Sequence, residues 1–303
     1  MSTAAPTDSS AVASTFTTIS AARKIRDSLA TVLVTAAFLL ALVPLIWVLY
    51  TVLERGFTVI LSGEWWTQSL SGLLGRQQGG GAYHAIYGTL VTSLVCAVLS
   101  IPIGIMVAVY LVEYGGRSRL ARTTTFMVDI LTGVPSIVAA LFIYALWIAI
   151  LGFSRSALAV SFALVLLMVP VVVRSTEEML KIVPNELREA SYALGVPKWK
   201  TIIRVVIPTA LSGILSGIML ALARVMGETA PVLVLVAYAA FINFNIFDGN
   251  MATLPLLMTV ERNNPTAAGA DRIWGSALTL ILIIALLGVL ATILSRVFSV
   301  KNK

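Results

Sequence analysis

The chain carries, at residues 29–53, the run LATVLVTAAFLLALVPLIWVLYTVL, which contains no charged side chain. A helix rises 1.5 Å per residue, so about 20 apolar residues cross the roughly 30 Å of hydrocarbon in a bilayer. The run is long enough to span a membrane and too long for the core of a secretory signal peptide. We therefore expect an uncleaved first transmembrane helix within residues 23–54.

Apolar residues dominate the remainder of the chain as well. Of its 303 residues, 58% are hydrophobic and only 12% are charged, and the mean hydropathy is +0.96. A soluble domain carries about 25% charged residues, so a water-soluble fold is excluded. The fold class we predict is an all-α integral membrane protein with six transmembrane helices. The five further runs lie at about 86–112, 126–151, 157–173, 209–236 and 274–297.

Lys and Arg are distributed unevenly between the segments that join these runs. If the amino terminus is cytoplasmic, most basic residues fall in inner segments, as the positive-inside rule requires. This pattern predicts a multi-pass inner-membrane protein with both termini in the cytoplasm, in contact with membrane lipid. It also explains the net charge of +7 without a nucleic-acid partner. The outer segments hold only Arg55, Arg76, Arg155, Arg262 and Arg272.

The composition also divides the chain into segments. Residues 1–22, rich in Ser, Thr and Ala, predict a disordered cytoplasmic tail. An outer loop is expected at 55–84, because Trp65 and Trp66 suit an interface and a Gly-Gly-Gly stretch suits a linker. A core of five helices follows at 85–298, including an outer segment at about 241–272 that either covers a pathway or meets an external protein. Residues 299–303 form a cytoplasmic carboxyl terminus.

Metal and redox chemistry find no support in the sequence. Cys96 is the single cysteine, so no intrachain disulfide can form, and the lone His84 has no neighbouring ligand cluster. We expect His84 to be a loop or helix-start residue. We predict no metal site and no cofactor bound by this chain.

The most charged part of the chain, at about 185–200, is too polar to cross a membrane and too periodic to be a plain loop. Asn185 is a favourable cap, and Glu186 and Glu189 place negative charge in a first helical turn. Gly195 followed by Pro197 is a strong stop signal. We predict a short cytoplasmic helix over 186–194.

One face of this predicted helix is apolar and needs a partner. Leu187, Ala190 and Leu194 share that face. An interfacial helix lying on the inner leaflet would satisfy the same pattern, so periodicity alone leaves both interpretations open.

The stretch EASYALGVPKWKTIIRVVIP at 189–208 resembles the EAA loop of ABC-importer permeases. Glu189, Ala190, Gly195 and the Ile207-Pro208 pair match that pattern, and Ser191 replaces its second alanine. The resemblance implies a coupling helix that docks into a cytoplasmic ATPase. The chain contains no GxxxxGK[ST] phosphate loop, so ATP and Mg²⁺ are expected on that partner and the chain is not itself an enzyme. The coupling residues implied are Glu186, Glu189, Ala190, Leu194 and Gly195.

Charged residues inside the predicted spans call for a partner or a pathway, because each costs about 2.5–3.5 kcal/mol at a helix centre. Arg224 and Glu228 lie four residues apart in the fifth span and share one helix face. Pro231 cannot donate to the carbonyl of residue 227, so the helix should kink or break there. Asp129 lies in the third span and Arg174 closes the fourth, where a lipid-interface anchor is the alternative interpretation.

Arg224 allows two interpretations. It is either a buried structural ion pair with Glu228 or part of an anion route. A guanidinium stays charged and binds phosphate through a planar fork of donors. In that case Glu228 would hold the arginine in place and prevent it from trapping a multivalent anion, because transport requires release as well as binding.

The segments RVMGETAP at 224–231 and LTGVPSIV at 131–138 are similar to the PstA-type permeases of bacterial phosphate ABC importers, which belong to the MetI-like type I permeases. The resemblance covers roughly residues 83–296. It implies inward transport of inorganic phosphate by alternating access, with Arg224 and, on weaker grounds, Arg174 in the passage. The partners implied are a homologous PstC-like permease subunit, a PstB-like ATPase dimer and an external PstS-like phosphate-binding protein.

Three other functions remain open at this level. A similar permease could carry sulfate, molybdate or another oxyanion. An ion-coupled secondary transporter would instead use Asp129 or Glu228 as a titrating group, but the sequence shows no matched pair of broken-helix halves. An integral-membrane enzyme would need a nucleophile elbow or metal cluster, and no such motif is present.

Overall fold

The computed structural model describes residues 20–298, and every regular element in that range is a helix. The chain divides into two compact units, residues 1–51 and 52–303. Helix α1 (Ala21–Ile60) starts in the first unit and ends in the second. It is longer than the predicted 23–54 span, because hydropathy marks only the part of a helix inside the membrane. The helix itself continues to Ile60, and Leu61 and Ser62 are no longer helical. The predicted tail (1–22) lies almost wholly, and the predicted carboxyl terminus (299–303) wholly, outside the described residues.

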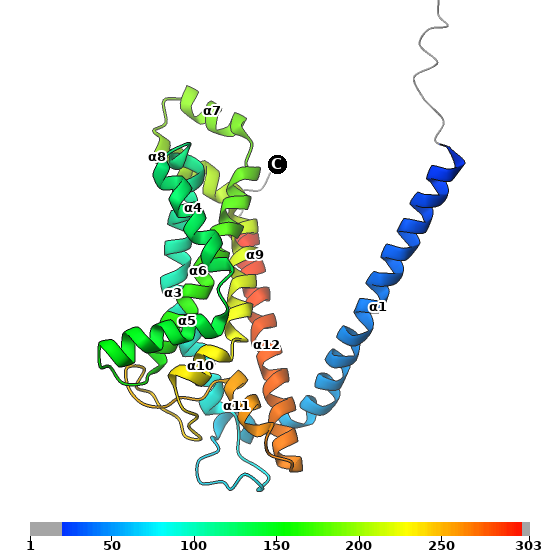
Figure 1. Ribbon diagram of the computed structural model, residues 1–303, viewed down its shortest axis with the longest axis vertical. Coiled ribbons are helices and arrows are strands. Elements are labelled where there is room, and N and C mark those ends of the chain that lie inside the picture. The colour runs from blue at the N-terminus through cyan, green and yellow to red at the C-terminus, as the bar shows by residue number, and fades with distance from the viewer. Residues whose placement is uncertain (1–19, 299–303) are drawn as a thin grey trace, which may run out of the picture. The chain divides into compact units, whose positions relative to one another are not determined.

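Four long helices run side by side in the second unit (Figure 1). They are α3 (Tyr83–Val109), α6 (Ala157–Ile182), α9 (Ile207–Met226) and α12 (Ala267–Phe298). Helix α6 is central and packs against α3 on one side and α9 on the other. Its fully buried Leu164, Met168 and Val172 belong to the main apolar core. A small residue permits α9 to approach α6 closely, since a Cβ at Gly217 would lie 2.4 Å from Ser175 of α6.

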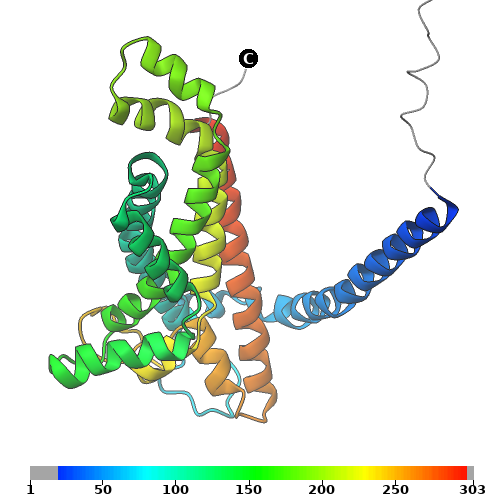
Figure 2. The same cartoon turned by 45° about the horizontal axis from the view of Figure 1, so that its top comes forward.

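The third predicted span is not one straight helix. Instead, α4 (Arg119–Thr132) and the helix formed by α5 (Ser136–Ile143) and η2 (Tyr144–Ile150) meet at an angle of 105°, and Figure 2 shows α5 turned across the bundle. Pro135 causes the break, because its ring removes a backbone donor and keeps the preceding residue out of helical geometry. The described chain thus has five helices able to cross a membrane, and six if this bent pair counts as one span.

Short helices occupy the two ends of the bundle (Figure 1). At one end lie α7 (Asn185–Ala193) and α8 (Lys198–Thr201), flanked by the π-helical turns η1 (Tyr110–Gly115) and η3 (Ile202–Val206). At the other end lie α10 (Ala230–Leu235), α11 (Leu254–Glu261) and the loop that follows α2 (Gly63–Thr67). The positive-inside pattern predicts that the first end is cytoplasmic, so we call it the inner end and the second the outer end.

Candidate functional site

The helix break predicted beside Arg224 is confirmed. Helix α9 ends at Met226, Gly227 closes it by donating its N–H to the Arg224 carbonyl at 3.1 Å, and α10 starts at Ala230. Pro231 falls in the first turn of α10, where its missing N–H costs nothing. The break therefore interrupts the fifth span one turn after Arg224.

Arg224 and Glu228 form a loose ion pair across this break. The Arg224 Nε and Glu228 Oε1 atoms are 3.9 Å apart, at the limit of direct contact. The Arg224 side chain is 52% exposed within the chain, whereas that of Glu228 is 17% exposed. Arg224 is therefore half exposed within the chain, so the buried structural pair considered from the sequence is not what the structure shows.

Hydroxyl groups surround Glu228 on its buried side. With Glu228, they line a small cavity of about 10 Å³, close to the volume that holds one water molecule. Sequence reasoning missed these residues, although three of them recur on one face of the second span, which was a readable signal. The hydroxyls belong to Thr89, Thr92, Ser93 and Thr253.

The structure also brings Asp129 and Arg174 together. Arg174 donates from Nη2 to the Asp129 carboxylate and from Nη1 to Glu177 Oε2 at 2.7 Å. Glu177, which sequence reasoning did not single out, also accepts from Lys181 at 2.7 Å. Arg174 thus lies in a cluster of alternating charges between α4 and α6, and whether it lines a pathway stays a prediction.

The two arginines lie at different depths in the bundle. Helices α6 and α9 run antiparallel, and Gly217 meets Ser175 where they touch. Arg174 is therefore level with about residue 218 of α9, six residues before Arg224. At 1.5 Å per residue, Arg174 lies about 9 Å closer to the inner end than Arg224.

The predicted cytoplasmic helix is present as α7, one residue earlier than expected. Pro184 rather than Asn185 precedes it, and Asn185 is its first helical residue, so the predicted Asn185 cap is wrong. Pro184 has a non-helical ψ of 141° and makes no side-chain capping hydrogen bond to the first turn. The predicted stop is confirmed, since Gly195 has a φ of +74° in the left-handed region.

The residues predicted to couple the chain to an ATPase lie on the accessible surface of this end. Leu194 is 84% exposed, so the apolar stripe of the helix has no cover within the described residues. The stripe remains available to a partner, although the docking itself is untested. Glu186, Glu189, Ala190 and Gly195 are likewise exposed.

A buried ion pair that sequence reasoning missed fixes α7 to the bundle. Arg188 Nη2 lies 2.8 Å from Glu113 Oε1, and the two side chains are only 13% and 4% exposed. Arg188 also donates to the carbonyls of Val183 at 2.7 Å and Leu180 at 3.0 Å. The only sequence signal was an isolated acid, Glu113, among basic inner residues.

Ser191, the departure from the EAA pattern, has a structural role. Its side chain faces inward, and its Oγ lies 2.8 Å from Thr201 Oγ1 of α8. This hydrogen bond joins α7 to the segment that leads into α9, which carries Arg224 at its far end. A serine replaces alanine here because it has a buried hydroxyl partner.

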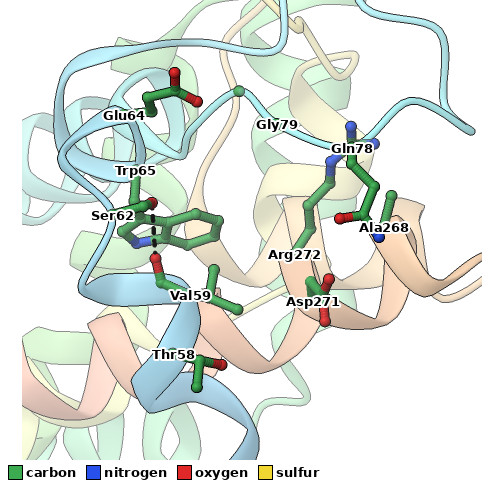
Figure 3. A pocket seen from close by; sticks show the side chains of 11 residues that line it. Thr58, Val59, Ser62, Glu64, Trp65, Gln78, Gly79, Ala268, Asp271 and Arg272 are labelled. Atoms are coloured by element: carbon green, nitrogen blue, oxygen red, sulfur yellow. Dashed lines mark hydrogen bonds between the residues drawn. The ribbon is translucent and has the colours of Figure 1, made fainter.

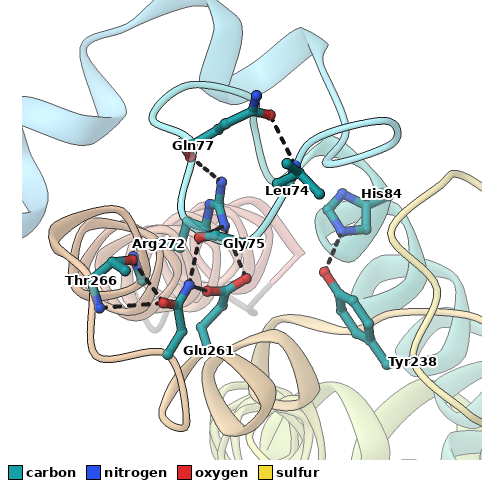
Figure 4. Close-up of polar contacts among 10 residues, drawn as sticks. Leu74, Gly75, Gln77, His84, Tyr238, Glu261, Thr266 and Arg272 are labelled. Atoms are coloured by element: carbon teal, nitrogen blue, oxygen red, sulfur yellow. Dashed lines mark hydrogen bonds and ion pairs between the residues drawn. The ribbon is translucent and has the colours of Figure 1, made fainter.

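The outer end holds a second buried ion pair (Figure 4). Arg272 Nη1 lies 3.2 Å from Glu261 Oε1, and Arg272 also donates to the Gln77 carbonyl at 2.8 Å, so it fastens the outer loop to α11 and α12. The helix-start prediction for His84 is correct: it is the second residue of α3, and its Nε2 lies 3.3 Å from the Tyr238 hydroxyl. Burial, followed by the Glu261 charge, raises the pKa of Tyr238 to about 12, so this phenol stays protonated at neutral pH.

The outer loop also borders a cavity of about 290 Å³ (Figure 3). Carboxylates of Glu64 and Asp271 line it, and Arg272 is already neutralised by Glu261. Two carboxylates repel an anion, so this cavity does not suit phosphate. Within residues 20–298, no group of three or more His, Cys, Asp or Glu side chains is placed to hold a metal ion.

Comparison with known proteins agrees with these features. Residues 100–302 match the family described as binding-protein-dependent transport system inner membrane component. The chain is 61% identical over 267 residues to the phosphate transport system permease protein PstA of Mycobacterium leprae, covering 88% of each chain. It is 39% identical to PstA of Yersinia pestis, covering 93% of this chain and 92% of the relative.

Solved structures extend the likeness to the fold. The chain aligns with an inward-facing MetNI methionine ABC transporter at 20% identity and a TM-score of 0.57, covering 73% of this chain and 95% of that one. A bacterial ABC transporter that imports alginate aligns at 12% identity and a TM-score of 0.60, covering 92% and 97%. At these identities the structures indicate a shared ABC-permease fold and not a shared cargo.

Proposed function

Because this chain belongs to the PstA family of binding-protein-dependent transport system inner membrane components, we propose that it is the permease subunit through which an ABC importer moves inorganic phosphate inward. The observation that carries this proposal is the open arginine at a broken transmembrane helix. Arg224 is half exposed and only loosely paired, so an oxyanion can replace Glu228 as its partner. Broken helices at membrane depth normally line a cavity, which is where a passing ion needs a charged group.

Arg174 offers a second, deeper site for the same anion. It lies about 9 Å nearer the cytoplasm than Arg224, a distance that an ion covers in one short step. Its pairing with Asp129 and Glu177 keeps its affinity for an anion moderate. Two arginines at successive positions along the pathway, each partly neutralised by a carboxylate, bind phosphate weakly enough to release it.

The coupling segment supplies the mechanical link. We propose that α7 docks into a cytoplasmic ATPase dimer through its exposed apolar stripe, with Glu186, Glu189, Ala190, Leu194 and Gly195 at the contact. The Arg188–Glu113 pair joins α7 to η1, which continues α3, and the Ser191–Thr201 bond joins α7 to the segment preceding α9. A movement of α7 is thereby passed to the helix that carries Arg224. ATP and Mg²⁺ belong to the ATPase.

The remaining partners and the orientation follow from the same proposal. A homologous permease subunit completes the pathway by alternating access, and an external phosphate-binding protein delivers the cargo to the outer end. Both termini lie in the cytoplasm of the bacterial inner membrane, as the distribution of Lys and Arg favours.

The test is uptake of radiolabelled phosphate by the whole complex in proteoliposomes. Arg224→Ala should lower phosphate uptake by about 100-fold or more, because a charge-assisted bidentate contact with the anion is lost. The complex should still assemble. Unlabelled sulfate or molybdate in excess should leave phosphate uptake unchanged. Normal uptake by an expressed Arg224→Ala complex would remove this arginine from the pathway, and strong competition by sulfate would reassign the cargo.

A further inference from the structure

A second arginine lies beyond the Arg224 break, on the outer side of the chain. Arg262 follows the last residue of α11, and its side chain lines a cavity of about 280 Å³. The same cavity is bordered by Gly227 and Thr229, which form the break itself, and by Thr259. It therefore begins three residues after Arg224, where an anion arriving from outside would first meet the broken helix.

The charge of Arg262 is free to act on a ligand. Among residues 20–298, no carboxylate forms an ion pair with Arg262. The nearest acid along the chain, Glu261, turns away and contacts Arg272 and Asn264 instead. Arg262 and Arg272 therefore differ, since Arg272 is buried and paired with Glu261 whereas Arg262 is exposed beside the cavity.

The two threonines define what kind of anion fits. Thr259 donates its own hydroxyl proton to the Pro255 carbonyl at 2.8 Å, which leaves its oxygen to accept a further hydrogen bond. Thr229 precedes α10 without capping it through its side chain, so its hydroxyl can donate. A protonated oxyanion such as phosphate can satisfy both groups, whereas fully deprotonated sulfate has no proton to give to Thr259.

We infer that Arg262, Thr229 and Thr259 form an outer receiving site that holds phosphate before it passes to Arg224. The inference rests on the proposed transport function and adds a position to it. Arg262 supplies the charge that draws the anion into the cavity, and Thr259 favours the protonated form. The site lies at the end of the chain to which an external binding protein would deliver its cargo.

Chemical labelling tests the site without relying on transport. Met258 lines the cavity but has no polar role, so Met258→Cys in a Cys96→Ala background places one thiol there within the assembled complex. A negatively charged methanethiosulfonate reagent should label it about tenfold faster than a positively charged one, because Arg262 attracts the anion. Phosphate should slow this labelling more than sulfate does.

Two arginine variants separate the site from general surface charge. Arg262→Gln should remove the preference for the anionic reagent and lower phosphate uptake about tenfold, with partial recovery in Arg262→Lys. Arg76→Gln removes the same charge from an outer-loop residue that does not line this cavity, and should change neither.

The outcomes distinguish failure of the site from failure of the transport proposal. Equal labelling by both reagents, or an equal effect of Arg262→Gln and Arg76→Gln, overturns the receiving site while leaving the Arg224 experiment to judge transport. Protection by sulfate as strong as protection by phosphate overturns the role given to Thr259.

Discussion

Two arginine–glutamate pairs in this chain have the same chemistry and opposite surroundings. Arg188 and Glu113 lie 2.8 Å apart with 13% and 4% of their side chains exposed, and backbone carbonyls satisfy the remaining arginine donors. Arg224 and Glu228 lie 3.9 Å apart, and the arginine is 52% exposed. The first pair is a structural joint, whereas the second leaves its arginine available to another partner. The geometry of a charged pair, rather than its presence, indicates which of the two roles it has.

The pairs also differ in how the chain brings them together. Arg224 and Glu228 are four residues apart, so any helix would place them near each other. Glu113 and Arg188 are separated by 75 residues and meet only because η1 packs beside the segment around α7. Variants at both pairs should therefore change the free energy of unfolding by very different amounts.

The largest loss of stability is expected from Arg188→Ala. It leaves Glu113 buried without a partner, which costs about 3–5 kcal/mol. The thermal midpoint of the purified complex and the amount of assembled protein should both fall. Glu178→Ala, a change at an exposed residue of α6 that forms no ion pair within the described residues, should stay within about 0.5 kcal/mol. Equal midpoints for the two variants would show that the Arg188 pair is not a structural joint.

A smaller loss is expected from Gly195→Val. The left-handed φ of +74° costs a non-glycine residue about 1–2 kcal/mol, and no atom lies within 4 Å of a Cβ there, so the strain is in the backbone alone. The distorted end of α7 should let ATP hydrolysis continue without phosphate uptake. Gly288→Val in α12, where a Cβ also meets nothing within 4 Å, is the matched control and should keep hydrolysis and uptake coupled.

Ser191→Ala should cost about 1 kcal/mol, the typical net contribution of one hydrogen bond. It removes the contact with Thr201 and restores the alanine of the EAA pattern. A double-mutant cycle with Thr201→Val, followed by thermal unfolding, measures this bond directly. If the two losses simply add, Ser191 and Thr201 do not interact in the assembled complex.

The smallest change in stability is expected from the variant with the largest functional effect. Arg224→Ala should alter the free energy of unfolding by about 1 kcal/mol or less, because an exposed, loosely paired arginine contributes little. Thermal unfolding of the same preparation used for uptake gives the comparison. A loss as large as that of Arg188→Ala would mean that Arg224 is structural after all.

Much of the fold could be predicted because its signals are local. Apolar runs placed the long helices, Gly195 and Pro197 placed the end of α7, and Pro231 placed the break after α9. The bend at Pro135 was missed, although Gly-Val-Pro is also a local signal, because the apolar run continues without interruption across it.

Site residues were predictable to the extent that their partners lie within one helix. The Arg224–Glu228 pair followed from a spacing of four, and the exposed face of α7 followed from periodicity. The hydroxyls around Glu228 and the contact between Asp129 and Arg174 did not, because each depends on which helices pack together. Assignment of these residues to a phosphate pathway stays a prediction.

The order of residues alone predicted a helical membrane protein with a short polar helix between the fourth and fifth spans and a broken fifth span. Hydropathy, turns and helix stops depend on near neighbours, so they can be read along the chain. Tertiary packing decides which charged side chains are buried in ion pairs and which stay exposed. It pairs Arg188 with Glu113 and Arg272 with Glu261, while Arg224 and Arg262 stay exposed, because the burial and partners of a side chain depend on residues far away in sequence.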